Sequence, residues 1–357
     1  MCFLDCKNKI NINSINILID AFISNKRKSL VLIFNNYDHI LKNTNINTDK
    51  TTILFGDTIL QYKILREFTN FHTIEGVNPR QFFNNKFHHE ILIIENFINI
   101  YSINDSFKIE LLLNDSNNNC IITKILEIDT LNNLFLDKKC ISTIHYNEHH
   151  LIPLWVKYHK KLGFEKFIIY DNNFEECKKN ELYKSIEDYK DDIFIINASW
   201  NYWLTSYGYN PVGQVIQQNH CIWKYSPKFV LLTDLDEYIN IKNYNLFNNS
   251  ISILSIPNWW FGCNNNVHYE NNNFIYKLTK KTSIENRQET SYRKCLIQSE
   301  CVDVFCVHMP ILFNNSIVYL NYNEGYLNHY FIMSSKKRKC KCSKYCAVEE
   351  GIIDIIN

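Results

Sequence analysis

Between residues 138 and 232 the chain alternates short, wholly apolar runs with longer segments of helical periodicity. The runs have the β-branched and aromatic composition of buried strands. They comprise residues 140–144, 167–170, 193–196 and 229–232. Strands that are apolar on both faces and are separated by helices belong to parallel sheets covered on both sides. The pattern therefore predicts an α/β domain with a mostly parallel sheet and helices on both faces.

The segment after the first apolar run has the clearest helical signal. Its apolar positions are Leu151, Leu154, Trp155, Tyr158 and Leu162. They recur at the spacing of one helix face. Pro153 stands near the helix start, where a missing N–H costs nothing, and Gly163 follows at the position of a C-terminal cap. We expect a helix here, and weaker patterns predict others near residues 181–189 and 212–225.

The chain changes character along its length. At about 150 residues per domain, its 357 residues have room for two domains. Short β-type runs separated by Asn, Asp and Gly predict a smaller strand-rich accessory domain over residues 1–135. The α/β pattern extends over residues 136–335. Residues 336–357 form a basic, cysteine-containing tail.

The balance of charges gives no sign of a polyanionic partner. With 38 basic and 37 acidic residues the net charge is +1, so no basic field predicts nucleic-acid binding. No stretch approaches the ~18 uninterrupted apolar residues of a membrane span. The first residues show no apolar run typical of a signal peptide. We therefore expect neither a nucleic-acid partner nor a transmembrane segment.

The cysteines bear on the compartment. There are 13 of them, scattered along the chain, which favours reduced thiols over a disulfide framework. We expect a cytoplasmic protein. If the AT-rich bias toward Asn, Ile and Lys reflects a viral source, the compartment would be the host-cell cytoplasm.

The acidic cluster Asp234-Leu235-Asp236-Glu237 directly follows the fourth apolar run. Carboxylates this close repel one another unless a cation or solvent compensates them. Mn²⁺ and Mg²⁺ prefer oxygen ligands and keep positions open for substrate phosphates. A bare Asp-x-Asp also occurs as a solvated acidic turn. With the buried strand before it, both interpretations stay open, because ligands of such sheets bind beyond the carboxyl ends of the strands.

Polar residues also follow the first two apolar runs. Asn147 and Glu148 come after the first run, and Asp171 ends the second. At a sheet's carboxyl edge these side chains are candidates for contacts to a nucleotide, for example to ribose hydroxyls. They are equally typical of polar turns.

The segment from His145 to His149 matches H-x-x-E-H, the inverted zinc-protease motif. A zinc hydrolase using His145, Glu148 and His149 is therefore an alternative. It requires both histidines on one helix face. The predicted strand-to-helix turn at this point argues against that arrangement.

Two later histidines are further candidates. His308 and His329 each stand in an apolar context, where a lone histidine is usually structural. Either imidazole could instead complete a Mn²⁺ shell.

Taken together, these segments resemble glycosyltransferase family 92, formerly domain of unknown function 23, a relative of the family 2-like glycosyltransferases. The resemblance covers residues 138–335. It is carried by residues 140–148, 154–163 and 168–172, by Gln214 and Gln217, by residues 231–239, by Trp260-Phe261-Gly262, by residues 293–297, by Val307-His308 and by Asn328-His329-Tyr330-Phe331.

The resemblance implies a GT-A fold, which is Rossmann-like, a UDP-sugar donor and usually Mn²⁺. It assigns Asp234 and Asp236 to the metal and the donor diphosphate. It places Asn147, Glu148 and Asp171 near the nucleotide. A C-terminal histidine, here His308 or His329, often joins the metal.

Transfer in this family is regarded as inverting, which requires a carboxylate base. Glu285, Glu289 and Asp303 are candidates, and no catalytic residue is assigned. Two features depart from the family. No membrane anchor is seen, and Cys263 follows Trp260-Phe261-Gly262 where a small serine is expected.

The sequence thus predicts transfer of a sugar from a UDP-sugar donor to a glycan or glycoprotein acceptor, with Mn²⁺ or Mg²⁺. A nucleotidyltransferase on the same fold is an alternative, because it also uses an Asp-x-Asp metal site. A non-enzymatic glycan-binding module is another. The intact Asp-x-Asp argues against that module.

Overall fold

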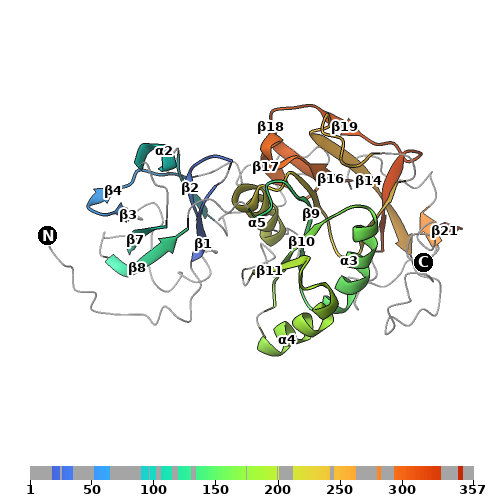
Figure 1. Cartoon of the computed structure of the whole chain (residues 1–357), viewed down its shortest axis with the longest axis horizontal. Helices are drawn as coiled ribbons and strands as arrows, with labels where there is room; N and C mark the ends of the chain where they lie inside the picture. Colours follow the sequence, from blue (N-terminus) through green and yellow to red (C-terminus); the bar gives the residue numbers. More distant parts are fainter. Residues whose placement is uncertain are drawn as a thin grey trace, which may run out of the picture. The chain divides into compact units, whose positions relative to one another are not determined.

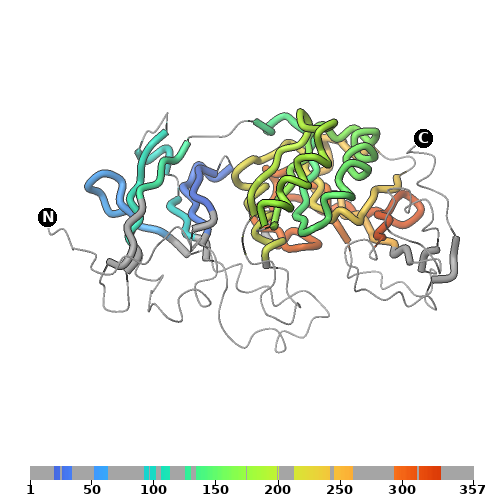
Figure 2. Tube along the Cα trace, turned by 90° about the horizontal axis from the view of Figure 1, so that it is seen from below, coloured from blue at the N-terminus to red at the C-terminus, as the bar shows by residue number. Residues whose placement is uncertain are grey.

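The computed structural model divides into two compact units (Figure 1 and Figure 2). It describes residues 18–24, 26–34, 52–64, 90–95, 97–101, 106–114, 120–129, 134–173, 175–198, 200, 212–241, 245–262, 280–282, 293–330 and 345–348. The first unit contains residues 1–134, 199–216 and 223–226. The second contains residues 135–198, 217–222 and 227–357.

The first unit contains two antiparallel four-stranded sheets. One has the order β1 (Leu18–Ile23), β2 (Leu30–Phe34), β6 (Glu90–Ile94) and β5 (Lys63–Ile64). The other has the order β4 (Thr58–Ile59), β3 (Thr52–Phe55), β7 (Phe107–Asn114) and β8 (Cys120–Ile128). The short helix α2 (Phe97–Tyr101) adds Phe97 to a core shared by both sheets. The described part of this region is thus strand-rich.

The second unit begins with the predicted parallel strands. They are β9 (Lys139–His145), β10 (Lys166–Asp171), β11 (Ile193–Asn197) and β12 (Phe229–Leu232). In space the order is β11-β10-β9-β12, and every neighbouring pair is parallel. The α/β class and these strands are confirmed.

Helices contact both faces of this parallel part. They are α3 (Ile152–Lys161), α4 (Glu176–Ser185) and α5 (Val212–His220). Phe167 and Tyr170 of β10 lie three positions apart and so face opposite ways. The Phe167 ring packs 5.7 Å from that of Trp155 on α3. The Tyr170 hydroxyl lies 2.7 Å from Nδ1 of His220 on α5.

Beyond β12 the sheet changes direction. Strand β16 (Arg293–Ile297) is antiparallel to both β12 and β14 (Ile253–Gly262). The remaining strands that join are β13 (Glu237–Ile241), β15 (Lys280–Thr282), β19 (Ile317–Tyr319), β20 (Gly325–His329) and β21 (Tyr345–Val348). A separate hairpin pairs β17 (Val302–Cys306) with β18 (Met309–Phe313).

The large sheet is therefore mixed, and the prediction of a mostly parallel sheet is wrong beyond its first four strands. The reason is local. Parallel neighbours need a long crossover, usually a helix. Within the described ranges, no α-helix follows α5.

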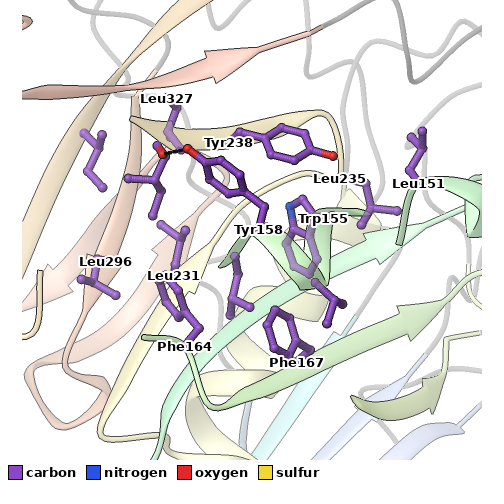
Figure 3. Close-up of a cluster of buried hydrophobic side chains, with 14 of the residues drawn as sticks. Leu151, Trp155, Tyr158, Phe164, Phe167, Leu231, Leu235, Tyr238, Leu296 and Leu327 are labelled. Carbon is purple, nitrogen blue, oxygen red and sulfur yellow. Dashed lines mark hydrogen bonds between the residues drawn. The ribbon is translucent and has the colours of Figure 1, made fainter. Parts of the chain in front are cut away.

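The segment that follows β12 packs into the hydrophobic core beneath α3 (Figure 3). Leu235 is buried in this core together with Trp155 and Tyr158. Trp155 Nε1 donates a 3.2 Å hydrogen bond to the Glu237 carbonyl, and the Tyr158 hydroxyl donates to the Ile239 carbonyl. Helix α3 thereby anchors β13 and the turn before it.

The helices in the described part of the chain are also relevant to the membrane prediction. None of them combines the length and apolarity that a bilayer crossing demands.

Candidate functional site

Residues 234–237, here called the acidic turn, connect β12 to β13. The Glu237 N–H donates a 3.2 Å hydrogen bond to the Asp234 carbonyl. The side chain of Asp234 is 33% exposed, whereas that of Asp236 is only 3% exposed. The turn therefore presents one carboxylate to solvent and holds the second just beneath the surface.

Glu237 holds this turn in shape. Its Oε2 accepts hydrogen bonds from the Thr233 hydroxyl at 2.6 Å and from the Asp234 N–H at 3.0 Å. Its Oε1 accepts one from Asn258 Nδ2 at 2.8 Å. Burial raises the pKa of the Glu237 carboxyl, and the neighbouring aspartates add to that shift. No role was expected for Glu237, and in the structure its carboxylate braces the turn from inside.

A lysine on the next strand, which the sequence analysis did not single out, neutralises part of this charge. Lys294 of β16 donates from Nζ to Asp234 Oδ2 at 2.9 Å and lies 3.6 Å from Glu237 Oε2. Its side chain is 1% exposed. Burial disfavours the ammonium, but Asp234 and Glu237 outweigh burial and raise the Lys294 pKa above its usual range. Lys294 is therefore a cation at neutral pH.

His329 lies on the other side of the turn. Strand β20 pairs with β13 so that His329 is opposite Glu237. Its Nε2 is 3.4 Å from Asp236 Oδ2, and its Nδ1 is 3.7 Å from Glu237 Oε1. Burial lowers the pKa of the His329 imidazole, but the surrounding carboxylates, Asp236 first, raise it overall. Both ring nitrogens thus face carboxylates.

His308 has a different environment, in the turn between β17 and β18. Its Nδ1 is 3.0 Å from the Arg293 carbonyl oxygen. Because a carbonyl only accepts, Nδ1 carries the proton and Nε2 is the nitrogen that can act as an acceptor. Burial, with Lys294 adding to it, lowers the His308 pKa to about 3. The imidazole is therefore neutral at physiological pH.

The metal prediction can be compared with this arrangement. Among the residues that the structure describes, no three His, Cys, Asp or Glu side chains are grouped to hold a metal ion. Asp234 is engaged by Lys294, and Asp236 lies beside His329.

The predicted nucleotide contacts lie at the carboxyl ends of β9 and β10. Asn147 has a φ of 59° and its N–H donates to Asn173 Oδ1 at 3.0 Å. Asn173 in turn donates to Asp171 Oδ1 from both its N–H, at 3.0 Å, and its Nδ2, at 2.6 Å. Glu148 is half-buried beside them. Asn173, which the sequence did not single out, therefore joins Asn147 to the buried Asp171.

This edge of the sheet also carries the start of the acidic turn. The Thr233 N–H donates a 3.2 Å hydrogen bond to the Ser142 carbonyl of β9. The ends of β9, β10 and β12 are parallel neighbours. The candidate residues at all three strand ends thus belong to one edge.

The two histidines of the zinc-hydrolase alternative face different carboxylates. His145, buried at the end of β9, has Nε2 3.4 Å from Asp171 Oδ1. His149 opens the 3-10 turn His149–Leu151, with Nε2 3.5 Å from Glu181 Oε2. Burial lowers the His145 pKa to about 4. The histidines do not share the helix face that this mechanism needs.

The candidate bases are only partly visible. Glu285 and Glu289 lie outside the described residues, as does Cys263. Asp303 is half-buried on β17.

Comparison with known proteins adds the family. The model of glycosyltransferase family 92 matches residues 139–354, which is more than half of the chain. The match includes the acidic turn, Lys294 and both histidines, and most of the segment set apart as a tail. No curated protein matches the chain significantly. The chain belongs to glycosyltransferase family 92.

Proposed function

We propose that the protein transfers a sugar from a UDP-sugar to a hydroxyl of a glycan or glycoprotein acceptor, with inversion and with Mn²⁺ or Mg²⁺. The observation that carries this proposal is the acidic turn. Asp234 and Asp236 lie at the carboxyl edge of parallel strands, where such sheets bind their ligands. Family membership supplies the class of reaction.

The turn suits a diphosphate site because its carboxylates are fixed before substrate arrives. Glu237 braces the backbone at Asp234, and Tyr330 N–H donates a 2.7 Å hydrogen bond to the Asp236 carbonyl. Groups held in place by such contacts need little reorganisation during the reaction. We assign Asp234 and Asp236 to the site of the donor diphosphate, which leaves as part of UDP.

The donor set fits Mn²⁺ or Mg²⁺ as a shared ligand of protein and substrate. Such ions are commonly held by one or two carboxylates together with substrate phosphates, which two aspartates in one turn can provide. When bound, the ion would offset the charge that develops on the leaving diphosphate. The described residues alone do not form a three-ligand group, so the phosphates are an essential part of this proposal.

Of the two histidines, we favour His308 as a further ligand of an ion that arrives with the diphosphate, since the described residues are not already grouped around one. Its Nδ1–H is held by the Arg293 carbonyl, which is the outer-shell arrangement usual for metal-ligating histidines. His329 instead faces carboxylates with both nitrogens. We assign His329 to charge compensation of Asp236.

The nucleotide is proposed to bind where β9 and β10 end. Asn147 is exposed there and Glu148 is half-buried, so both are accessible to a ligand. Asp171 is buried and its Oδ1 is bonded to Asn173. We propose that Asp171 acts by holding this loop.

In an inverting transfer, the oxygen of the acceptor hydroxyl attacks the anomeric carbon. A carboxylate must take the proton of that hydroxyl as the attack proceeds. Glu237 does not meet this requirement, because it is fully buried and both oxygens accept hydrogen bonds. The base is therefore to be sought outside the acidic turn.

The proposal is tested by measuring UDP release from a panel of UDP-sugars with the full chain. We expect release with at least one donor in the presence of Mn²⁺, and its loss on adding EDTA. Restoration by excess Mn²⁺ controls for damage by the chelator. UDP release that persists in EDTA would contradict the metal dependence. An absence of UDP release with every donor would contradict the proposal that the donor is a UDP-sugar.

A further inference from the structure

We propose that Lys294 serves as the resident cation of the donor-free acidic turn, so that a divalent metal ion binds together with the donor diphosphate and only weakly before it. This inference deepens the proposed function and rests on it for the identity of the donor. It concerns a residue that the sequence analysis did not single out.

The Lys294 ammonium lies within the acidic turn. Lys294 Nζ is 2.9 Å from Asp234 Oδ2 and 3.6 Å from Glu237 Oε2. One ammonium therefore lies within ion-pair distance of two of the three carboxylates in the turn. Close carboxylates require such compensation, and here the protein provides it without a metal ion.

The Lys294 ammonium is also buried behind Asp234. The Lys294 side chain is 1% exposed, whereas that of Asp234 is 33% exposed. A ligand arriving from solvent thus meets Asp234 and not the ammonium behind it. Lys294 is a positioning residue that acts through Asp234.

The position of Lys294 in the sheet holds the ammonium beside the acidic turn. Strand β16 pairs with β12 in fixed register, Cys295 opposite Leu232. The backbone of Lys294 is thereby tied to the strand from which the acidic turn departs. The ammonium is held by the sheet itself and not by a loose surface loop.

Together these features couple the metal ion to the diphosphate. A divalent ion at Asp234 would approach a fixed positive charge, which weakens its binding to the protein alone. A diphosphate brings negative charge that offsets both cations. The donor and the metal ion are therefore expected to favour each other's binding by a thermodynamic coupling, which must be reciprocal.

The test is Mn²⁺ binding to the full chain by equilibrium dialysis, with and without UDP. A protein-free chamber corrects for Mn²⁺ complexed by UDP. For the wild type we expect UDP to tighten Mn²⁺ binding at least about tenfold. Equal Mn²⁺ affinity with and without UDP would overturn the proposal, and this arm needs no variant.

Variants then assign the effect to the lysine. Lys294→Met should tighten Mn²⁺ binding in the absence of UDP by about tenfold, while its affinity for UDP falls. Lys294→Arg, which keeps the charge, should stay close to wild type. Lys160→Met is the matched control, since it removes an ammonium paired with Asp192 elsewhere in the same unit.

A structural defect would weaken both ligands, so opposite changes in the Mn²⁺ and UDP affinities identify the charge effect. Unchanged or weaker Mn²⁺ binding by folded Lys294→Met would overturn the proposal. The two proposals fail separately. If no UDP-sugar is turned over, the proposed function fails. The Mn²⁺ affinities of wild type and Lys294→Met without UDP can still be compared, and they test the role of Lys294 separately.

Discussion

The Glu237 carboxylate accepts a 3.0 Å hydrogen bond from the backbone N–H of Asp234, three residues before it. The acidic turn is thus closed by one of its own side chains. The same carboxylate also receives the Thr233 hydroxyl and the Asn258 amide. Three donors depend on it, and the Thr233 hydroxyl and the Asn258 amide lie in the interior of the protein.

Replacing Glu237 should therefore destabilise the fold. Glu237→Ala leaves buried donors without an acceptor, and we expect a loss of ~3 kcal/mol or more in the free energy of unfolding. Urea denaturation measures this. Glu324 is the matched control, because its Oε2 accepts the Asn321 N–H at 2.9 Å in an exposed turn. Glu324→Ala should cost ~1 kcal/mol or less, and equal losses for the two variants would contradict the role of Glu237.

His329 should make stability depend on pH in one direction. Burial lowers its pKa, but Asp236 and its neighbours raise it overall. A raised folded-state pKa stabilises the fold fully below the unfolded value of about 6.5 and loses that contribution as pH rises through the folded pKa. His329→Gln should thus cost more stability at pH 6 than at pH 9, measured by urea denaturation at both values. The exposed His150→Gln is the control, and an equal cost at both pH values would contradict the ion pair with Asp236.

His159 should act in the opposite direction. It is buried in α3, with Nδ1 2.9 Å from the Trp155 carbonyl, and burial lowers its pKa to about 3. The unfolded state therefore binds a proton first, so stability falls as pH drops below about 6.5 and continues to fall toward the folded pKa. His159→Phe keeps a ring stacked near Tyr238 and removes the titration. The variant should lose less stability than wild type between pH 7 and pH 5, and parallel losses would refute this origin.

Tyr158 offers a test of how the core supports the site. Its hydroxyl donates to the Ile239 carbonyl of β13, just after the acidic turn. Tyr158→Phe retains the ring and should cost ~1 kcal/mol in unfolding free energy. Tyr183, exposed on α4, is the control position. If Tyr158→Phe is no more destabilising than Tyr183→Phe, the hydrogen bond does not anchor β13.

The elements with local signals were predictable from the sequence. The four parallel strands and α3 were expected at nearly the residues where they occur, because periodicity and caps are properties of neighbouring residues. The strand ends carrying Asn147, Asp171 and Asp234 followed from the same pattern, since parallel strands place their carboxyl ends at one edge.

The remaining features depend on pairing between distant segments. Lys294 meets Asp234 across 60 residues of sequence, and Asn258 meets Glu237 across 21. Both contacts depend on the antiparallel pairing of β16 with β12 and β14. Short apolar runs in the sequence do not specify the register of such pairing. Glu237 carried a weak local signal, a carboxylate three residues after the N–H it receives. No local pattern around Lys294 predicts that its side chain is buried.

Metal-dependent sugar transfer at the acidic turn can be tested by comparing two aspartate variants with the wild type. UDP release is measured for wild type, Asp236→Asn and the surface control Asp192→Asn at saturating Mn²⁺ and donor. If the acidic turn holds the metal ion and the donor diphosphate, Asp236→Asn lowers kcat by at least about 100-fold, while Asp192→Asn stays close to wild type. A folded Asp236→Asn variant that releases UDP at the wild-type rate would rule out this role for the acidic turn.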